Sequence, residues 1–307
     1  MKFNPFDQTL LYGLDKFFIE MKSLSDANIL PNKILLSGFK GIGKCTLAIH
    51  LINYILSKNE DFKYDVENFT INKENKSYKL IQNKSSPNFY HIDIRNENKN
   101  IDINQIRELI EFCNKSSFND KPRFILIDNI EFLNLNSSNA LLKILEEPNN
   151  NIYFILINSG KFILPTVKSR CVNFKINLSY NESIFVINKI IGNDIFSKIN
   201  KDLINYYFTP GNFLKLYNFS NENKIDISEL DLDNFLIKII EGNFYKKDSS
   251  IKDLVYDFIQ MLYLRRVKLN QNFEDYMSYI KLVNDAKIFN LDNENLFTKL
   301  RMKLMHE

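Results

Sequence analysis

The sequence predicts an α/β domain built on a parallel sheet, followed by an all-helical second half. Three observations lead to this fold class. Short apolar runs alternate with helix-like segments up to about residue 180, and strand signals become sparse after it. A glycine-rich loop over residues 38–46 joins the first apolar run to a helix over Lys44–Leu56. We expect three domains, over residues 1–178, 179–224 and 225–307.

Four continuous apolar runs are expected to be strands, because strands buried on both faces of a parallel sheet lose the alternating pattern. They are Lys33–Ser37, Phe89–Ile94, Arg123–Ile127 and Ile152–Ile157. The polar stretch Ser57–Asn88 lies between the first two and is expected to be an extended insertion with a small hairpin.

Two helices are expected between the later strands. In Ile101–Asn114, apolar residues recur at three- and four-residue steps, and Asp102 or Asn104 is placed to cap the start. Asn134 is placed to cap a second helix over Leu135–Glu147, which Pro148 ends.

The second half reads as a series of helices, with a break at Thr209-Pro210-Gly211 and a further boundary near Ser220–Ser228. The expected helices are Asn181–Ile191, Leu203–Phe208, Asn212–Tyr217, Leu230–Glu241, Ile251–Lys268 and Asp275–Ala286.

The amino-acid composition of the chain limits the classes of function that it can have. The 307 residues carry a formal charge of +3, which by itself does not indicate a nucleic-acid binder. No apolar run approaches the roughly 18–20 residues that cross a bilayer, and the N-terminus lacks a signal-peptide core, so a cytoplasmic protein without membrane contact is expected. The three cysteines, Cys45, Cys113 and Cys171, are far apart, which predicts no disulfide framework and no zinc site.

The glycine-rich loop matches the phosphate-binding pattern G-x-x-x-x-G-K. Gly38, Gly41, Gly43 and Lys44 hold its positions, and three of the chain's eight glycines lie here. Backbone N–H groups of such a loop bind phosphate oxygens, and the lysine neutralises them. The alternative is a tight strand–helix turn with an incidental lysine.

The residue after Lys44 departs from the pattern. Magnesium prefers hard oxygen ligands, and Cys45 offers sulfur where the pattern has a hydroxyl. Thr46 has a hydroxyl, but it lies about 100° further round the helix. We therefore expect metal binding to be weakened and predict no metal site.

Asp128 follows the strand Arg123–Ile127, where phosphate-loop hydrolases place a metal-associated carboxylate. The next residue is Asn129, which cannot accept a proton, and Glu131 is offset along the chain. The alternative is an aspartate that merely ends a strand.

A long ordered string completes the pattern: residues 139–148 read N-A-L-L-K-I-L-E-E-P, a strand follows, and Ser169-Arg170-Cys171 comes after it. In this respect the chain resembles the bacterial clamp-loader AAA+ subunits, and among them the delta-prime subunits of DNA polymerase III. The resemblance covers at least residues 11–175; beyond about residue 180 it is architectural.

The resemblance implies a nucleotide-binding-type domain, a small helical lid and a helical collar that forms the oligomer. It implies that Arg170 is an arginine finger presented to ATP on a neighbouring subunit, with Ser169 capping its segment or meeting the same phosphate. The lid arginine of active loaders is replaced by Gly211. With Cys45 and Asn129, this departure implies a non-hydrolysing, stator-like subunit.

The implied partners are the tau/gamma ATPase subunits and the delta subunit in a hetero-pentamer, the sliding clamp, and primed DNA through the complex. No cofactor is required, although weak ATP or ADP binding is compatible with the loop. No zinc is carried over, because the chain has no cysteine between the first helix and the next strand.

Rival functions remain open at this point. The chain is alternatively an active AAA+ ATPase, either the loader's motor subunit or a related DNA-remodelling enzyme. A phosphate-loop kinase or GTPase is less favoured, because the sequence has no identifiable acceptor site or guanine-reading motif. The basic run Arg265–Lys268 is interpreted as a solvated helix face rather than a DNA contact.

Overall fold

The computed structural model describes residues 4–94, 100–115, 119–146, 151–204, 208–247, 249–268, 273–289, 294, 297–298 and 301–302. The chain divides into two compact units, Lys2–Val186 and Ile187–Glu307. The division falls inside helix α7 (Tyr180–Ile191). The finer division at residues 178 and 224 remains a prediction.

The N-terminal unit is built on a five-stranded parallel sheet with the strand order β2-β3-β4-β1-β5. The strands are β1 (Lys33–Ser37), β2 (Phe89–Ile92), β3 (Arg123–Ile127), β4 (Ile152–Asn158) and β5 (Val172–Lys175). The four predicted strands are confirmed. β5 was not predicted, because Asn173 and Lys175 interrupt its apolar residues; its first and last residues are exposed.

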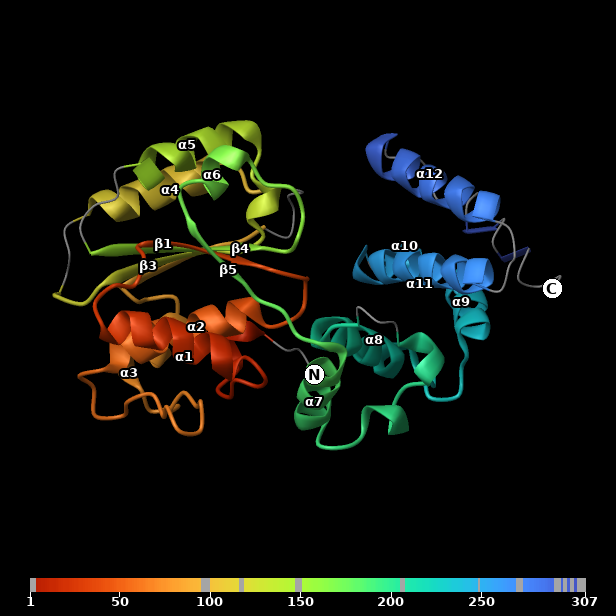
Figure 1. Ribbon diagram of the computed structural model, residues 1–307, viewed down its shortest axis with the longest axis horizontal. Helices are drawn as coiled ribbons and strands as arrows, with labels where there is room; N and C mark the ends of the chain where they lie inside the picture. Colours follow the sequence, from red (N-terminus) through yellow and green to blue (C-terminus); the bar gives the residue numbers. More distant parts are fainter. Residues whose placement is uncertain are drawn as a thin grey trace. The chain divides into compact units, whose positions relative to one another are not determined.

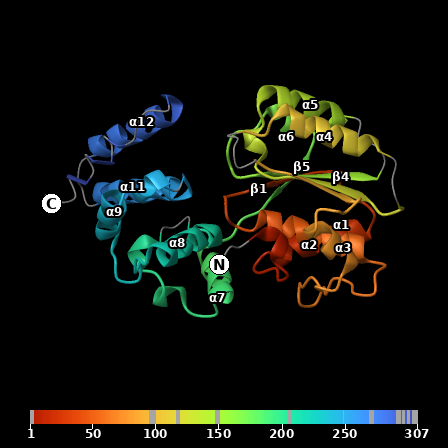
Figure 2. The ribbon, with the colours of Figure 1, turned by 180° about the vertical axis from the view of Figure 1, so that it is seen from behind.

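Helices cover both faces of the sheet, as Figures 1 and 2 show. One face carries α1 (Asp15–Asp26), α2 (Lys44–Ser57) and α3 (Lys76–Gln82). The other carries α4 (Ile103–Asn114), α5 (Leu135–Glu146) and the short α6 (Pro165–Lys168). The α/β fold class predicted for this half is confirmed.

Alternation along the strands divides the apolar side chains between two cores. Phe124 and Leu126 of β3 join the core beneath α1 and α2, whereas Ile125 and Ile127 join the core beneath α4 and α5. Because both faces are covered, all five residues of β3 are buried.

The predicted helix starts are borne out by hydrogen bonds. The Asp102 carboxylate accepts from the backbone N–H groups of Asn104 and Gln105, and the Gln105 side chain returns a bond to the Asp102 N–H. Asn134 Oδ1 accepts from the Ser137 N–H at 2.8 Å. The predicted end of this second helix, Glu147 and Pro148, lies outside the described residues.

The polar stretch 57–88 differs from the expectation of an extended insertion, because it contains α3. Asn75 caps this helix by accepting from the Tyr78 N–H, and Tyr78 and Ile81 are buried. The expected hairpin is reduced to an antiparallel bridge between Asp65 and Thr70. Apolar residues are too few here to give a helical period, so the cap was the only available signal.

His50 of α2 is fully buried and contacts the stretch 57–88 through Tyr64. Its Nε2 lies 3.1 Å from the Gln8 carbonyl oxygen, which can only accept, so Nε2 carries the proton. Nδ1 lies 2.9 Å from the Tyr64 hydroxyl and accepts from it. Burial lowers the pKa of His50 to about 4.

This shift predicts a loss of stability in acid. The unfolded chain takes up the His50 proton near pH 6.5 and the folded chain only near pH 4, so the unfolded state binds more protons between these values. Stability from neutral His50 is therefore complete above pH 6.5 and declines as the pH falls to 4, by on the order of 3 kcal/mol. The free energies of unfolding of wild type and His50→Gln, measured with urea across this pH range, check the prediction. The difference between these two free energies must shrink in acid. A constant difference contradicts it.

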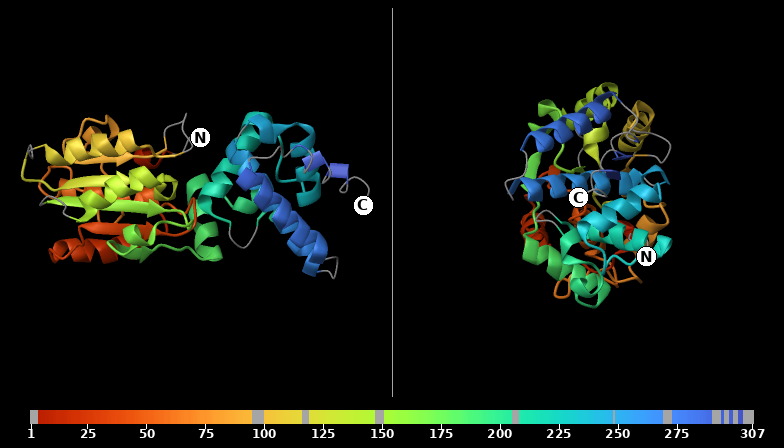
Figure 3. Two further views of the ribbon diagram at one scale, coloured as in Figure 1. Left: turned by 90° about the horizontal axis from the view of Figure 1, so that it is seen from above. Right: turned by 90° about the vertical axis from the view of Figure 1, so that its right-hand side faces the viewer.

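The described residues of the C-terminal unit form helices joined by turns and loops, with no strand among them, as predicted (Figure 3). After 3-10 turns at Ile195–Ser197 and Lys201–Leu203 come α8 (Pro210–Asn223), α9 (Leu232–Glu241), α10 (Phe244–Lys247), α11 (Ser249–Lys268) and α12 (Phe273–Phe289). Two further 3-10 turns, Pro5–Asp7 and Ile130–Phe132, belong to the N-terminal unit.

Two expectations in this unit need adjustment. The predicted break at Thr209-Pro210-Gly211 is the start of α8, where the Thr209 hydroxyl accepts from the Asn212 N–H and Pro210 occupies the first turn. The helix expected over Leu203–Phe208 falls on a 3-10 turn that ends at Leu203, and residues 205–207 lie outside the described ranges. No helix in the described part of the chain is long and apolar enough to cross a membrane.

Candidate functional site

The glycine-rich loop lies at the carboxyl edge of the sheet, between β1 and α2. Parallel α/β sheets bind ligands at this edge. The Gly38 N–H donates to the Asn158 carbonyl at the end of β4, which joins the loop to the neighbouring strand. Gly43 precedes α2 with a φ of +95° and has no side chain to cap the helix, so the first N–H groups of α2 are left for a ligand.

Lys44 is folded back into its own loop. Its side chain is buried, and Nζ donates to the carbonyl oxygens of Gly38 at 2.8 Å and Phe39 at 2.6 Å. Burial lowers the pKa of Lys44 to about 8, although the nearby carboxylates of Asp128 and Glu131 oppose the shift. The ammonium therefore stays largely charged at pH 7, and a bound phosphate would compete with the two carbonyls for it.

Cys45 and Asp128 lie against each other at the place where a loop hydroxyl would hold a metal. The thiol lies close enough to the Asp128 carboxylate for each group to shift the pKa of the other. Burial raises the pKa of Cys45, so it is a neutral thiol. Loss of water and the neighbouring Asp93 raise the pKa of Asp128 to about 6. Thr46 is half-buried in the same first turn of α2.

This donor set does not fit a magnesium ion. A protonated thiol is a soft and poor ligand, and it lies beside the carboxylate where a loop hydroxyl would be the second oxygen ligand. Among the described residues, no group of three or more His, Cys, Asp or Glu side chains is arranged to hold a metal.

Two further polar residues lie at this edge that the motif spacing did not predict. Asp93 follows β2, and its Oδ1 accepts from Asn129 Nδ2 at 2.8 Å. Asn158 ends β4 and lies close to Glu131, which also accepts from the Ser159 N–H. Asn158 is the last residue of the buried strand β4, which is the kind of signal that identified Asp128. Asp93 follows the mostly half-buried β2 and lay inside the predicted strand Phe89–Ile94, so this signal did not mark it.

Arg170 lies just after α6, away from the residues of the loop. Its Nη1 donates to the Thr166 carbonyl at 3.0 Å, and its Nη2 pairs with the Glu146 carboxylate at the end of α5. Ser169 is exposed, and its hydroxyl donates to the same Thr166 carbonyl. The structure thus brings Lys44, Cys45 and Asp128 together, while the described partners of Arg170 all belong to α5 and α6.

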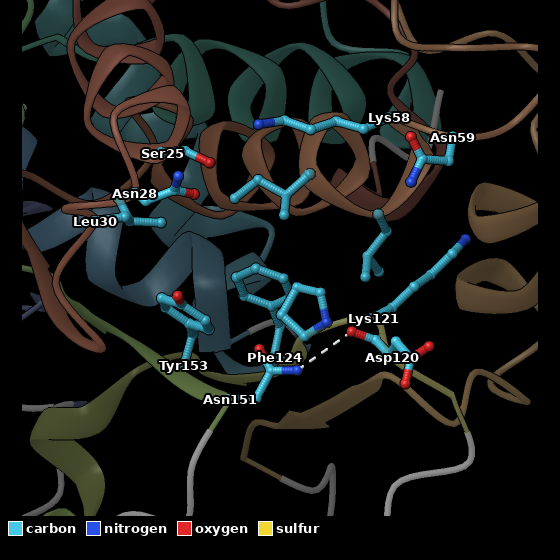
Figure 4. Close-up of a pocket in the computed structure, with 13 residues that line it drawn as sticks. Ser25, Asn28, Leu30, Lys58, Asn59, Asp120, Lys121, Phe124, Asn151 and Tyr153 are labelled. Atoms are coloured by element: carbon cyan, nitrogen blue, oxygen red, sulfur yellow. Dashed lines mark hydrogen bonds between the residues drawn. The ribbon is translucent and has the colours of Figure 1, made fainter.

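A cavity of about 550 Å³ lies at the opposite, amino edge of the sheet (Figure 4). Its walls include Lys121 and Pro122, which precede β3, and Asn151, which precedes β4. Asn151 Nδ2 donates to the Asp120 carbonyl across one side of it. Since the loop lies at the other ends of these strands, this cavity is separate from the candidate phosphate site.

Comparisons with known proteins place the chain in a family. The family model described as "DNA polymerase III, delta subunit" matches residues 14–179. Curated relatives include DNA polymerase III subunit gamma of Buchnera aphidicola subsp. Schizaphis graminum, 32% identical over 152 residues, and subunit delta′ of Pseudomonas aeruginosa, 32% identical over 139 residues.

These alignments cover 49% and 45% of this chain, and only 39% and 40% of the two relatives. Subunit delta′ of Buchnera aphidicola subsp. Baizongia pistaciae is 27% identical over 232 residues, covering 63% of this chain and 66% of that one. A solved structure of a DNA polymerase III gamma subunit-related protein from Thermotoga maritima has a TM-score of 0.44 at 17% identity, over 92% of this chain and 99% of the other.

The family match covers more than half of the chain and contains the phosphate-binding-type loop, the Cys45–Asp128 contact and the Arg170 segment. The resemblance predicted from the ordered motifs is thereby confirmed: this chain belongs to the DNA polymerase III delta subunit family.

Proposed function

We propose that this chain is a stator-like subunit of the DNA polymerase III clamp loader that completes a neighbour's ATP site with Arg170. The observation that carries this proposal is the contact between the Cys45 thiol and Asp128. It fills the place where an ATPase of this layout would hold its magnesium ion. A subunit with this loop is poorly equipped to cleave its own nucleotide.

The residue after Asp128 supports the same conclusion. Asn129 carries an amide, which cannot take a proton from an attacking water, and that amide is already bonded to Asp93. General-base assistance typically contributes 10²–10⁴-fold to a rate, so its loss alone would make hydrolysis in this loop slow.

Arg170 has the chemistry that a neighbour's triphosphate requires. A planar guanidinium binds two phosphate oxygens together, and it stabilises charge that develops as the terminal phosphate leaves. Its side chain is partly exposed and lies outside the home loop. We therefore assign it to the interface with an ATP-hydrolysing subunit, with Ser169 capping the segment that presents it.

The proposed assembly is a hetero-pentamer with tau/gamma ATPase subunits and a delta subunit, which opens the sliding clamp and loads it on primed DNA. We assign the helical C-terminal unit to the collar that joins the subunits and to the lid that precedes it. The basic face of α11 is not assigned to DNA, because Arg265 donates to the Asp202 carbonyl of the same unit.

Nucleotide binding without cleavage is compatible with this role. Gly41, Gly43 and Lys44 retain the groups that hold phosphates, so ADP or ATP is proposed to bind weakly. No cofactor is needed for the stator function, and no zinc is proposed.

The rival function is an active AAA+ ATPase, and it rests on the retained Lys44 and Asp128. Assay of the isolated chain separates the two. We expect ATP turnover with magnesium to be no higher in wild type than in Lys44→Ala. Lys40→Ala is the matched control, because Lys40 is an exposed lysine of the same loop. Turnover that requires Lys44 but not Lys40 would establish the rival.

A further inference from the structure

The proposed finger is held at two points by its own chain. Arg170 Nη2 pairs with Glu146 at the last residue of α5, and Nη1 donates to the Thr166 carbonyl in α6. Glu146 and Arg170 are 24 residues apart in sequence, and the strand β4 lies between them. The pairing therefore depends on the tertiary packing of α5 against α6.

The two contacts restrict the plane of the guanidinium while leaving donors for a ligand. An arginine side chain has five N–H donors in a rigid fork. The carboxylate and the carbonyl each take one from a different Nη atom, so three remain. A side chain that is already oriented loses less conformational freedom when it binds a phosphate.

The partial exposure of the Glu146–Arg170 pair is compatible with phosphate binding by Arg170. The Arg170 side chain is 32% exposed and that of Glu146 is 53% exposed, so the remaining donors have access to a partner from outside. A solvent-exposed pair is also weakly held, so the carboxylate orients the arginine without competing strongly with a triphosphate.

We propose that Glu146 is a positioning residue: it holds the Arg170 guanidinium in the orientation in which it meets the neighbouring subunit's triphosphate. This inference rests on the proposed function, since it takes the trans role of Arg170 as given. Glu146 itself touches no substrate in the proposal and acts only through Arg170.

A double-mutant cycle tests it in the reconstituted complex, with the ATP sites that do not border this chain inactivated. Complexes contain wild type, Glu146→Ala, Arg170→Ala or both changes, and kcat and KM for ATP are measured separately. We expect Glu146→Ala to lower kcat roughly tenfold with little change in KM, below the ~10²-fold that a 1 Å misplacement of a catalytic group can cost. In the Arg170→Ala background, the same change is expected to have no effect.

Two further variants separate positioning from a structural effect. Glu146→Gln keeps an oxygen that accepts from Arg170 but loses the charge, and it is expected to retain part of the kcat. Glu111→Ala removes an exposed glutamate of the neighbouring α4 and should match wild type. Gel filtration of each complex checks that assembly is unchanged.

The other possible outcomes each contradict the proposal in a distinct way. An unchanged kcat for Glu146→Ala overturns the proposal, and a raised kcat shows that Glu146 withholds the arginine instead. A loss that persists in the Arg170→Ala background means that Glu146 acts elsewhere. If Arg170→Ala leaves kcat unchanged, both the proposed function and this inference are wrong. If Arg170→Ala lowers kcat and Glu146→Ala does not, only this inference is wrong.

Discussion

Replacement of Arg170 by alanine is expected to abolish most ATP cleavage at the neighbouring subunit's site while leaving the complex assembled. Arginine fingers supplied by a second protein are worth about 10³–10⁵ in rate in other nucleotide hydrolases. Total turnover of the complex falls less than this, because sites that do not border this chain keep their own fingers. A single-turnover measurement, with the other ATP sites inactivated, isolates the affected site.

The fold of the chain is expected to tolerate this change. Arg170 makes one exposed ion pair and one bond to the Thr166 carbonyl, and exposed pairs contribute about 0–1 kcal/mol to stability. A loss of activity without a loss of assembly therefore reports on the interface. Were Arg170 merely a surface charge, the variant would turn over ATP at the wild-type rate.

Two control variants sharpen the result. Lys168→Ala removes an exposed cation two residues away and should leave the rate unchanged. Arg170→Lys keeps the charge but loses the planar fork, so it should restore little of the activity. Full activity in Arg170→Lys would show that only a positive charge is needed, which contradicts the assigned geometry.

Much of the fold was predictable because the sheet is parallel and buried on both faces. Continuous apolar runs such as Arg123–Ile127 identify the central strands, and a polar residue at the end of each run marks the ligand edge. β5 was missed because Asn173 and Lys175 interrupt its apolar residues, and its first and last residues are exposed at the edge of the sheet. α3 escaped because its few buried residues give no period of their own.

The site was predictable in its residue types but not in its contacts. The sequence identifies Lys44, Cys45 and Asp128 from spacing, yet spacing does not tell that Lys44 donates to its own loop or that the thiol meets the carboxylate. Asp93 and Glu146 reach their partners through packing between distant segments. Such contacts depend on where helices pack on the sheet, and a single sequence carries no local signal for them.

Gly38 is the position in the loop where any side chain is expected to be most damaging. Its φ is +156°, a region that side chains rarely adopt, and an added Cβ would lie 2.1 Å from the Ile176 carbonyl oxygen. Ile176 donates its N–H to the carbonyl of Ser37, the last residue of β1, so the obstructing atom is backbone held by the sheet. Neither side of this contact has a flexible end that can move away.

Gly38→Ala is therefore expected to lower the free energy of unfolding of the N-terminal unit by about 2–6 kcal/mol, from overpacking of about 1–3 kcal/mol and backbone strain of similar size. Gly160→Ala is the matched control: its φ is +83°, but its nearest neighbour is the Gly38 oxygen at 4.0 Å. Only the strain should appear there, so urea unfolding of the two variants separates the clash from the conformational cost. Equal losses would mean that the chain relaxes around Ile176. Nucleotide binding should also weaken in Gly38→Ala, because the loop whose N–H groups face the phosphates would shift with residue 38.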